Sequence, residues 1–108
     1  MEAMAVPIKP DKTDAWEAWT VELNGPRKAE FDDMNQRYGL TTHAAWLQNN
    51  PDGSQLAVVV FDGPGASSFM HDMAGSDHEF DVWFRSSVED VHPMDFSGPL
   101  PPAPKRFL

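Results

Sequence analysis

The clearest hydrophobic pattern along the chain is an apolar, valine-rich run at residues 55–62, which lies between clusters of turn-forming residues. A short run of this composition predicts a β-strand rather than a helix. Successive side chains of a strand point to opposite faces of the sheet. The two rows are Leu56, Val58 and Val60 on one face, and Ala57, Val59 and Phe61 on the other. Because both rows are apolar, we expect both faces of this strand to be covered.

Three further segments have the composition of strands. Residues 41–48 form one such run, and the turn formers at 49–54 separate it from the valine-rich run. The two runs are therefore predicted to pair as a β-hairpin. Residues 3–9 predict another strand, in which Pro7 has no N–H to donate and is expected near the end of the pairing. A brief strand at 94–96 would complete a sheet of four strands.

The first helical pattern follows an N-cap residue at Asp11, with apolar residues at helical spacing from Trp16 onwards. Pro26 interrupts this stripe, because proline removes a backbone hydrogen bond and strains the turn before it. The pattern fits either one helix kinked near Pro26 or two helices in line, with Asn24 capping the second. Gly39 is expected to end the stripe as the residue after the C-cap.

Two shorter helices are predicted in the second half of the chain. One starts at about Ala66 and is broken by Gly75. Residues 76–79 have the composition of a capping box, in which a serine hydroxyl and a glutamate carboxylate satisfy free N–H groups at the start of a helix. The apolar face of the helix that follows would carry Phe80, Trp83, Phe84, Val88 and Val91.

The predicted order of elements is strand, helix, strand, strand, helix, strand. This order is typical of an α+β fold of the ferredoxin-like β-α-β-β-α-β type, a four-stranded antiparallel sheet with helices on one face. We assign residues 1–96 to this single domain. Residues 97–108 are rich in proline and predict an extended tail.

Helices on one face leave the other face of such a sheet open. We expect the row of Ala57, Val59 and Phe61 to lie on that open face, where a second copy of the chain would cover it. Burying one large apolar side chain stabilises by roughly 1.5–3 kcal/mol, and two-fold symmetry doubles the row. The sequence therefore favours a homodimer through the sheet faces. The alternative is that the tail folds over its own sheet.

Charge and cysteine content narrow the class of partner. The chain has 17 acidic and 8 basic residues, a formal net charge of −9 and no cysteine. Nucleic acids and anionic membrane surfaces attract clustered lysine and arginine, so we expect neither as a partner. No apolar run approaches the roughly 20 residues that span a bilayer. The absence of cysteine excludes disulfides and thiol chemistry and suits a reducing compartment, so a cytoplasmic location is expected.

The densest group of ionisable residues surrounds His71 and His78. Its acidic members are Asp72, Asp77, Glu79 and Asp81. Histidines and carboxylates together can hold a divalent metal or carry out acid–base catalysis. However, Gly75 separates the two histidines, so they share no regular helix, and the acids suit the start of a helix. Helix capping and a solvated surface are therefore favoured, and no metal site is predicted.

His43 lies three residues before Trp46 on the second strand, on the opposite face by parity. A histidine and aromatic side chains lining a pocket between sheet and helices would suit a planar organic ligand. The favoured interpretation is that Trp46 packs in the core and that His43 is hydrogen-bonded. His92 is interpreted as a loop residue. The candidate pocket residues are Trp46, Trp83, Trp19 and Met70, all of which also suit a packed core.

The aromatic residues Trp16 and Trp19, together with the C-terminal run SDHEFDVWFRSSVEDVHPMDFSGPLPPAP, form a pattern that extends over most of the chain. This pattern resembles the uncharacterised DUF6176-type families of the dimeric α/β-barrel group. The resemblance implies a sheet-to-sheet homodimer and transfers no activity. The wider group includes monooxygenases, isomerases, ligand-binding regulators and haem-degrading enzymes. In the last class His71 or His78 would bind iron, but neither stands in a matching motif, and no cofactor is expected.

Two functions remain open at this point. The favoured one is a homodimeric module that binds a small molecule or has no catalytic role. The alternative is a small cofactor-independent enzyme of the monooxygenase or isomerase type, acting on a planar apolar substrate between helices and sheet. The enzyme hypothesis predicts that His43, His71 or His78 points into a cavity beside Trp46 or Trp83. The first is favoured because the sequence contains no convergent acid–base pair.

Overall fold

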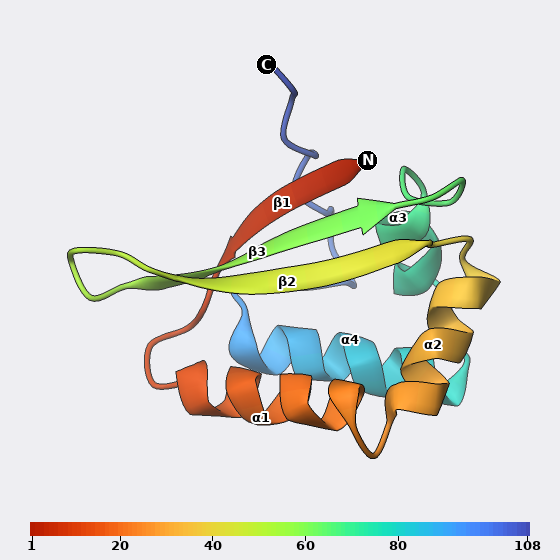
Figure 1. Ribbon diagram of the computed structural model, residues 1–108, viewed down its shortest axis with the longest axis horizontal. Coiled ribbons are helices and arrows are strands. Elements are labelled where there is room, and N and C mark those ends of the chain that lie inside the picture. Colours follow the sequence, from red (N-terminus) through yellow and green to blue (C-terminus); the bar gives the residue numbers. More distant parts are fainter.

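The computed structural model describes residues 1–108 and has one sheet above a layer of helices (Figure 1). The strands are β1 (Glu2–Pro7), β2 (Thr42–Asn49) and β3 (Gln55–Asp62). The helices are α1 (Thr13–Asn24), α2 (Lys28–Arg37), α3 (Phe69–Ala74) and α4 (Glu79–Val91). None of these helices combines the length and the apolar composition needed to cross a bilayer.

The three strands form one antiparallel sheet in the order β1-β3-β2. The predicted hairpin is confirmed as β2 and β3, and the backbone of Asn50 bonds to that of Ser54 across its turn at 2.9 Å. Pro7 is the last residue of β1 to pair, opposite Leu56. Its expected position at the end of the pairing is therefore also confirmed, and the missing N–H interrupts no ladder.

The predicted four-stranded ferredoxin-like sheet is wrong, because residues 94–96 form no strand. Two of their three backbone donors are bound locally instead. The Met94 N–H donates to the His92 carbonyl at 2.8 Å. The Phe96 N–H donates to the Glu89 carboxylate at 2.9 Å. Donors engaged in this way are not available to a neighbouring strand, so the sheet ends at β1.

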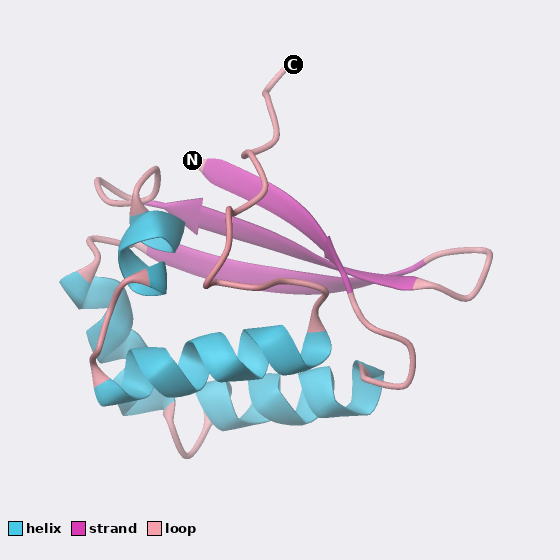
Figure 2. Cartoon of the chain, turned by 180° about the vertical axis from the view of Figure 1, so that it is seen from behind, coloured by secondary structure: helices cyan, strands magenta, loops and turns pink.

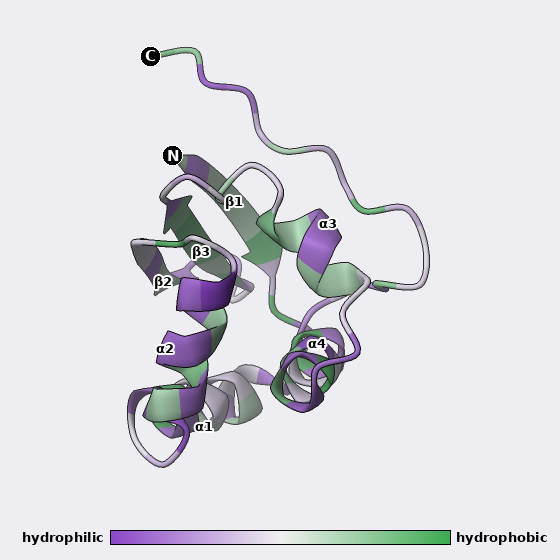
Figure 3. Cartoon of the chain, turned by 90° about the vertical axis from the view of Figure 1, so that its right-hand side faces the viewer, coloured by the Kyte–Doolittle hydropathy of each residue, from purple (hydrophilic) through white to green (hydrophobic).

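The face of β3 that carries Ala57 and Phe61 lies against the helices, and these residues are 0% and 4% exposed. The expectation that Ala57, Val59 and Phe61 form an open dimer contact is therefore wrong. The apolar residues of the opposite, open face are Ala3, Ala5 and Pro7 of β1, Ala44 and Trp46 of β2, and Leu56, Val58 and Val60 of β3. Figure 3 shows how apolar β1 and β3 are along their length. We call these eight residues the open apolar face.

The segment around Pro26 separates two helices, but they are not in line, because α2 turns away from α1 towards the sheet (Figure 1). Arg27, rather than the predicted Asn24, occupies the N-cap position of α2. At the start of α1 the N-cap position is held by Lys12 rather than by Asp11. Both predicted N-caps are therefore wrong, although the break itself is where the proline predicts it.

Two glycines hold the end of α2 in place. Gly39 ends the helix as predicted, with a φ of 69° that favours glycine. The Leu40 N–H returns to the Asn35 carbonyl at 2.8 Å, which is the Schellman pattern. Gly65, in the loop before α3, lies so close that a Cβ there would be 1.7 Å from the Tyr38 carbonyl oxygen. The loop therefore packs directly on the end of α2.

The buried side chains form two separate groups. The larger has 11 residues, including Met34, Phe69 and Met73. The smaller has four residues, Ile8, Trp16, Ala57 and Val91. Trp19 and Val59 are only partly buried and pack against both groups. The core is thus divided into two clusters, and the side chains between sheet and helices leave part of that space unfilled.

Candidate ligand-binding cavity

A cavity of about 450 Å³ lies between the sheet and the helices. Of its 21 lining residues, 17 are hydrophobic, and they come from all three strands and all four helices. The polar ones are Thr20, Asn24, His43 and His92. Cavities of this size, with mainly apolar walls and a few polar groups, are typical of small-molecule sites.

The mouth of the cavity is marked by its exposed lining residues. These are Asn24, at the end of α1, and Ala45, in β2. Strand β2 is an edge of the sheet, and α1 runs below it in the helical layer (Figure 1). A ligand would therefore enter between α1 and β2.

His43 projects from β2 among the aromatic rings of the cavity wall. Its ring centroid is 4.9 Å from that of Phe31 and 4.8 Å from that of Phe61. Its Nδ1 lies 2.9 Å from Oδ1 of Asn35, on α2. Desolvation by these surroundings lowers the pKa of His43 from 6.5 to about 4, so the ring is neutral at pH 7. The predicted hydrogen-bonded histidine is confirmed, and it also lines a cavity.

His92 also lines the cavity and is 4% exposed. Its Nδ1 lies 2.8 Å from the Pro7 carbonyl oxygen, and burial lowers its pKa. It follows the end of α4, as a loop residue should, but its burial was not predicted.

The other two candidate histidines lie outside this cavity. His71 and His78 are both exposed. The predicted capping box is wrong, because His78 rather than Ser76 caps α4, through its Nδ1, which accepts from the Phe80 N–H at 3.3 Å. Neither histidine therefore supports the enzyme hypothesis, and only His43 among the predicted catalytic candidates reaches the cavity.

Of the four candidate pocket residues, two line the cavity and two do not. Trp19 and Met70 belong to its wall. Trp46 lies on the open apolar face, opposite to His43 as parity requires, and it is 57% exposed, so its interpretation as a core residue is wrong. Trp83 is partly buried away from the cavity, where the Arg27 guanidinium lies 4.1 Å from the centroid of its ring. The structure brings no group of three or more His, Cys, Asp or Glu side chains together to hold a metal ion.

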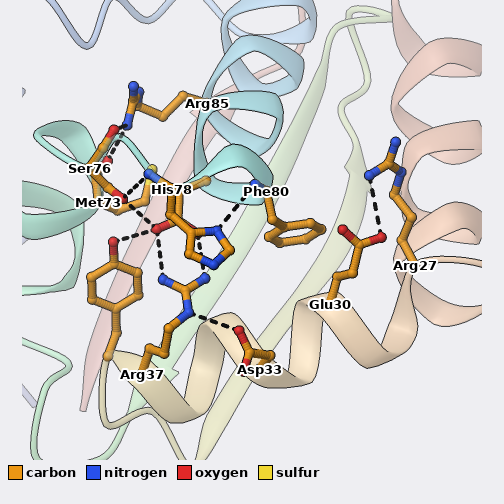
Figure 4. Close-up of polar contacts among 11 residues, drawn as sticks. Arg27, Glu30, Asp33, Arg37, Met73, Ser76, His78, Phe80 and Arg85 are labelled. Carbon is orange, nitrogen blue, oxygen red and sulfur yellow. Dashed lines mark hydrogen bonds and ion pairs between the residues drawn. The ribbon is translucent and has the colours of Figure 1, made fainter.

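A second buried polar group lies near the start of α4. Asp81 is 0% exposed and accepts two hydrogen bonds from the Arg37 guanidinium, at 3.0 and 2.8 Å. The Tyr38 and Ser76 hydroxyls donate two more, at 2.6 and 2.7 Å. Burial alone would raise the pKa of Asp81, but these donors outweigh it and lower that pKa to about 2. Figure 4 shows Arg37 reaching from α2 towards the start of α4.

Asp81 was predicted to belong to a solvated, helix-capping group, and this prediction is wrong. The sequence does contain a signal of its burial. Asp81 precedes Phe84 by three residues and Val88 by seven, which places it on the apolar side of the helix. Asn35 carries no comparable signal, because nothing near it in the sequence marks it as the partner of a strand histidine.

Comparison with known proteins gives no relative: no protein-family model, curated protein or solved structure matches the chain. Inference about function therefore starts from the cavity and its polar groups.

Proposed function

We propose that the protein binds a small, planar, mainly apolar organic molecule in the cavity between sheet and helices. The observation that carries this proposal is the cavity itself, with about 450 Å³ of space and 17 hydrophobic residues in its wall. An unfilled apolar space of this size costs a small domain stability, since its lining side chains lack packing partners. A ligand that occupies it would supply those contacts.

Catalysis by a cofactor-independent enzyme is the second candidate, and His43 is the observation in its favour. A neutral imidazole in an apolar cavity can accept a proton from a bound substrate. However, no carboxylate, lysine or arginine lines the cavity, and the other histidine there, His92, is bonded to the Pro7 carbonyl. One weakened base without a partner acid fits binding better than turnover.

The binding proposal is tested with naphthalene as a planar apolar probe and with variants that fill the cavity. Val59 lines the cavity, whereas its neighbour Val60 lies on the open apolar face. We expect Val59→Phe to weaken naphthalene binding at least tenfold, because the new ring occupies the space. Val60→Phe is the matched control and should bind like the wild type. If the wild-type protein binds no naphthalene in native mass spectrometry or fluorescence titration, the proposal fails.

We also propose that two copies associate through their open apolar faces. Eight apolar residues line this face, and Trp46 at its β2 side is 57% exposed. The C-terminal tail passes the sheet and ends on the same side, away from α1 and α4 (Figure 2). Phe107 and Leu108 are 88% and 103% exposed there. A partner seated on this face would cover the sheet and meet both tails.

The dimer proposal predicts that the wild type has the mass of two chains and that one charged substitution in the contact returns it to the mass of one chain. We expect the wild type to be a dimer at micromolar concentration in sedimentation equilibrium. Trp46→Lys should make it a monomer, because it places a charge in the contact. Val21→Lys is the matched control, since Val21 is 67% exposed on α1, away from the sheet. A wild-type monomer at all concentrations would contradict the proposal.

A further inference from the structure

Two histidines line the cavity, and in each the fold engages Nδ1: the Pro7 carbonyl meets that of His92, and Asn35 meets that of His43. His43 is surrounded by aromatic rings of four elements, at centroid distances between 4.8 and 5.9 Å. Its only hydrogen-bond partner in the chain is Oδ1 of Asn35, 2.9 Å from Nδ1. A carboxamide oxygen can only accept, so Nδ1 must carry the proton. In the neutral ring Nε2 is then left with a lone pair and no proton.

Nε2 of His43 has no hydrogen-bond partner in the chain and is not fully buried. It makes no hydrogen bond within the chain, and the buried side-chain polar atom without a partner is Nε1 of Trp19 instead. His43 lines the cavity, and Nε2 is the ring nitrogen that no group of the chain engages. The aromatic residues around it cannot accept or supply a conventional hydrogen bond. The cavity wall therefore carries a free acceptor at His43, beside the polar side chains of Thr20, Asn24 and His92.

The remaining wall limits the charge of a ligand. No lysine or arginine lines the cavity, so nothing there would balance an anionic group. A buried, unpaired anion is strongly disfavoured. The chain as a whole has a net charge of −9, which also repels anions from the mouth.

We propose that the ligand is a neutral aromatic molecule with a hydroxyl group, and that this hydroxyl donates a hydrogen bond to Nε2 of His43. This inference rests on the proposed function, because it names the class of molecule that the cavity takes. Asn35 acts as the positioning residue, since its carboxamide decides which ring nitrogen accepts. An ether, a ketone or a carboxylate of the same shape offers Nε2 no proton and would leave it unpaired.

The test compares 2-naphthol with 2-methoxynaphthalene, naphthalene and 2-naphthoate, which share one ring system and differ in what they offer Nε2. We expect 2-naphthol to bind about three- to tenfold more tightly than 2-methoxynaphthalene, the range of one net hydrogen bond. 2-Naphthoate should bind most weakly. On binding 2-naphthol, the ¹⁵N resonance of Nε2 should shift while Nδ1 stays protonated, a change that a purely structural histidine would not show.

Variants separate this inference from the binding proposal. His43→Phe should lose the preference for 2-naphthol over 2-methoxynaphthalene. Asn35→Leu should reduce the preference, because either ring nitrogen can then carry the proton, and it serves if His43→Phe does not fold. His71→Phe, which changes an exposed histidine, should leave the preference intact. Naphthalene binding without a preference for 2-naphthol would overturn the inference alone. Failure of all four compounds to bind would overturn both proposals.

Discussion

Two polar sites of this protein, at Asp81 and at His43, differ in how much of their hydrogen-bonding capacity is used within the chain. Asp81 accepts hydrogen bonds from Arg37, Tyr38 and Ser76. His43 has a single partner, Asn35, and borders a cavity. Nothing is left on Asp81 for a ligand to bind, whereas His43 keeps one nitrogen free. We therefore interpret Asp81, whose hydrogen bonds are all made within the chain, as a structural site. We interpret His43, which has an unused nitrogen and borders the cavity, as part of a binding site.

The location of the two sites supports the same distinction. Asp81 lies at a junction of α2, α4 and the loop before α4, and its bonds tie these elements together. His43 lies on an edge strand, and its one bond joins β2 to α2. Removing the first site should loosen the helical layer, whereas removing the second should leave the layers in place. The following predictions test this difference.

The largest effect is expected for Asp81→Ala. Removing the carboxylate leaves the Arg37 guanidinium and two hydroxyls without their acceptor, and breaking a buried ion pair destabilises by about 3–5 kcal/mol. We expect about 3 kcal/mol, at the low end of that range, because the Arg37 side chain is 30% exposed and water can reach it. The measurement is the free energy of unfolding in urea.

Asp33→Ala is the matched control for this prediction. Asp33 pairs with the same Arg37 at 2.9 Å, but its side chain is 58% exposed. Exposed pairs contribute roughly 0–1 kcal/mol, so this change should be small. Equal losses for the two variants would mean that Asp81 is not the anchor proposed here.

The two sites should lose their contributions to the free energy of unfolding in different pH ranges. The pKa of Asp81 is lowered from 3.8 to about 2, so its stabilisation is present above pH 3.8 and is lost as the pH falls towards 2, by about 2 kcal/mol. The pKa of His43 is lowered from 6.5 to about 4, so only the unfolded chain takes up its proton between these values. Stability should therefore fall by up to about 3 kcal/mol from pH 6.5 to pH 4.

Variants assign each of these losses to its site. Urea unfolding at a series of pH values should show that His43→Phe flattens the curve between pH 6.5 and 4, apart from the smaller contribution of His92, whose pKa is also lowered by burial. Asp81→Asn should flatten it below pH 4. A single acid transition that neither variant changes would show that other groups control acid unfolding.

Local chemistry explains which parts of this fold were predictable. The hairpin and the end of α2 were predictable, because turn formers and Gly39 act through their own backbone. The fourth strand failed because the N–H groups of Met94 and Phe96 are taken by the His92 carbonyl and the Glu89 side chain, which strand propensity does not report. The open face was misassigned because both rows of β3 are apolar, so side-chain alternation could not choose between them.

The site was predictable only in part, since its partners are distant in the sequence. Parity placed His43 and Trp46 on opposite faces correctly. The pairing of Asp81 with Arg37 spans 44 residues, and no local pattern of charges identifies it. The cavity arises because side chains from seven elements fail to meet, and hydrophobic periodicity reports which side chains point inward but not how well they fill the interior.

The smallest effect is expected for His43→Phe at pH 7, a change in the free energy of unfolding of less than about 1 kcal/mol. The variant loses one hydrogen bond, but Asn35 is only half-buried and can bond to water instead. The new ring would pack among Phe31, Phe61 and Phe69, which already surround the imidazole. A loss of about 3 kcal/mol, equal to that of Asp81→Ala, would make His43 a structural residue. A near-neutral result would show that folding does not need a histidine at this position, which leaves recognition of a ligand as the role of its free nitrogen.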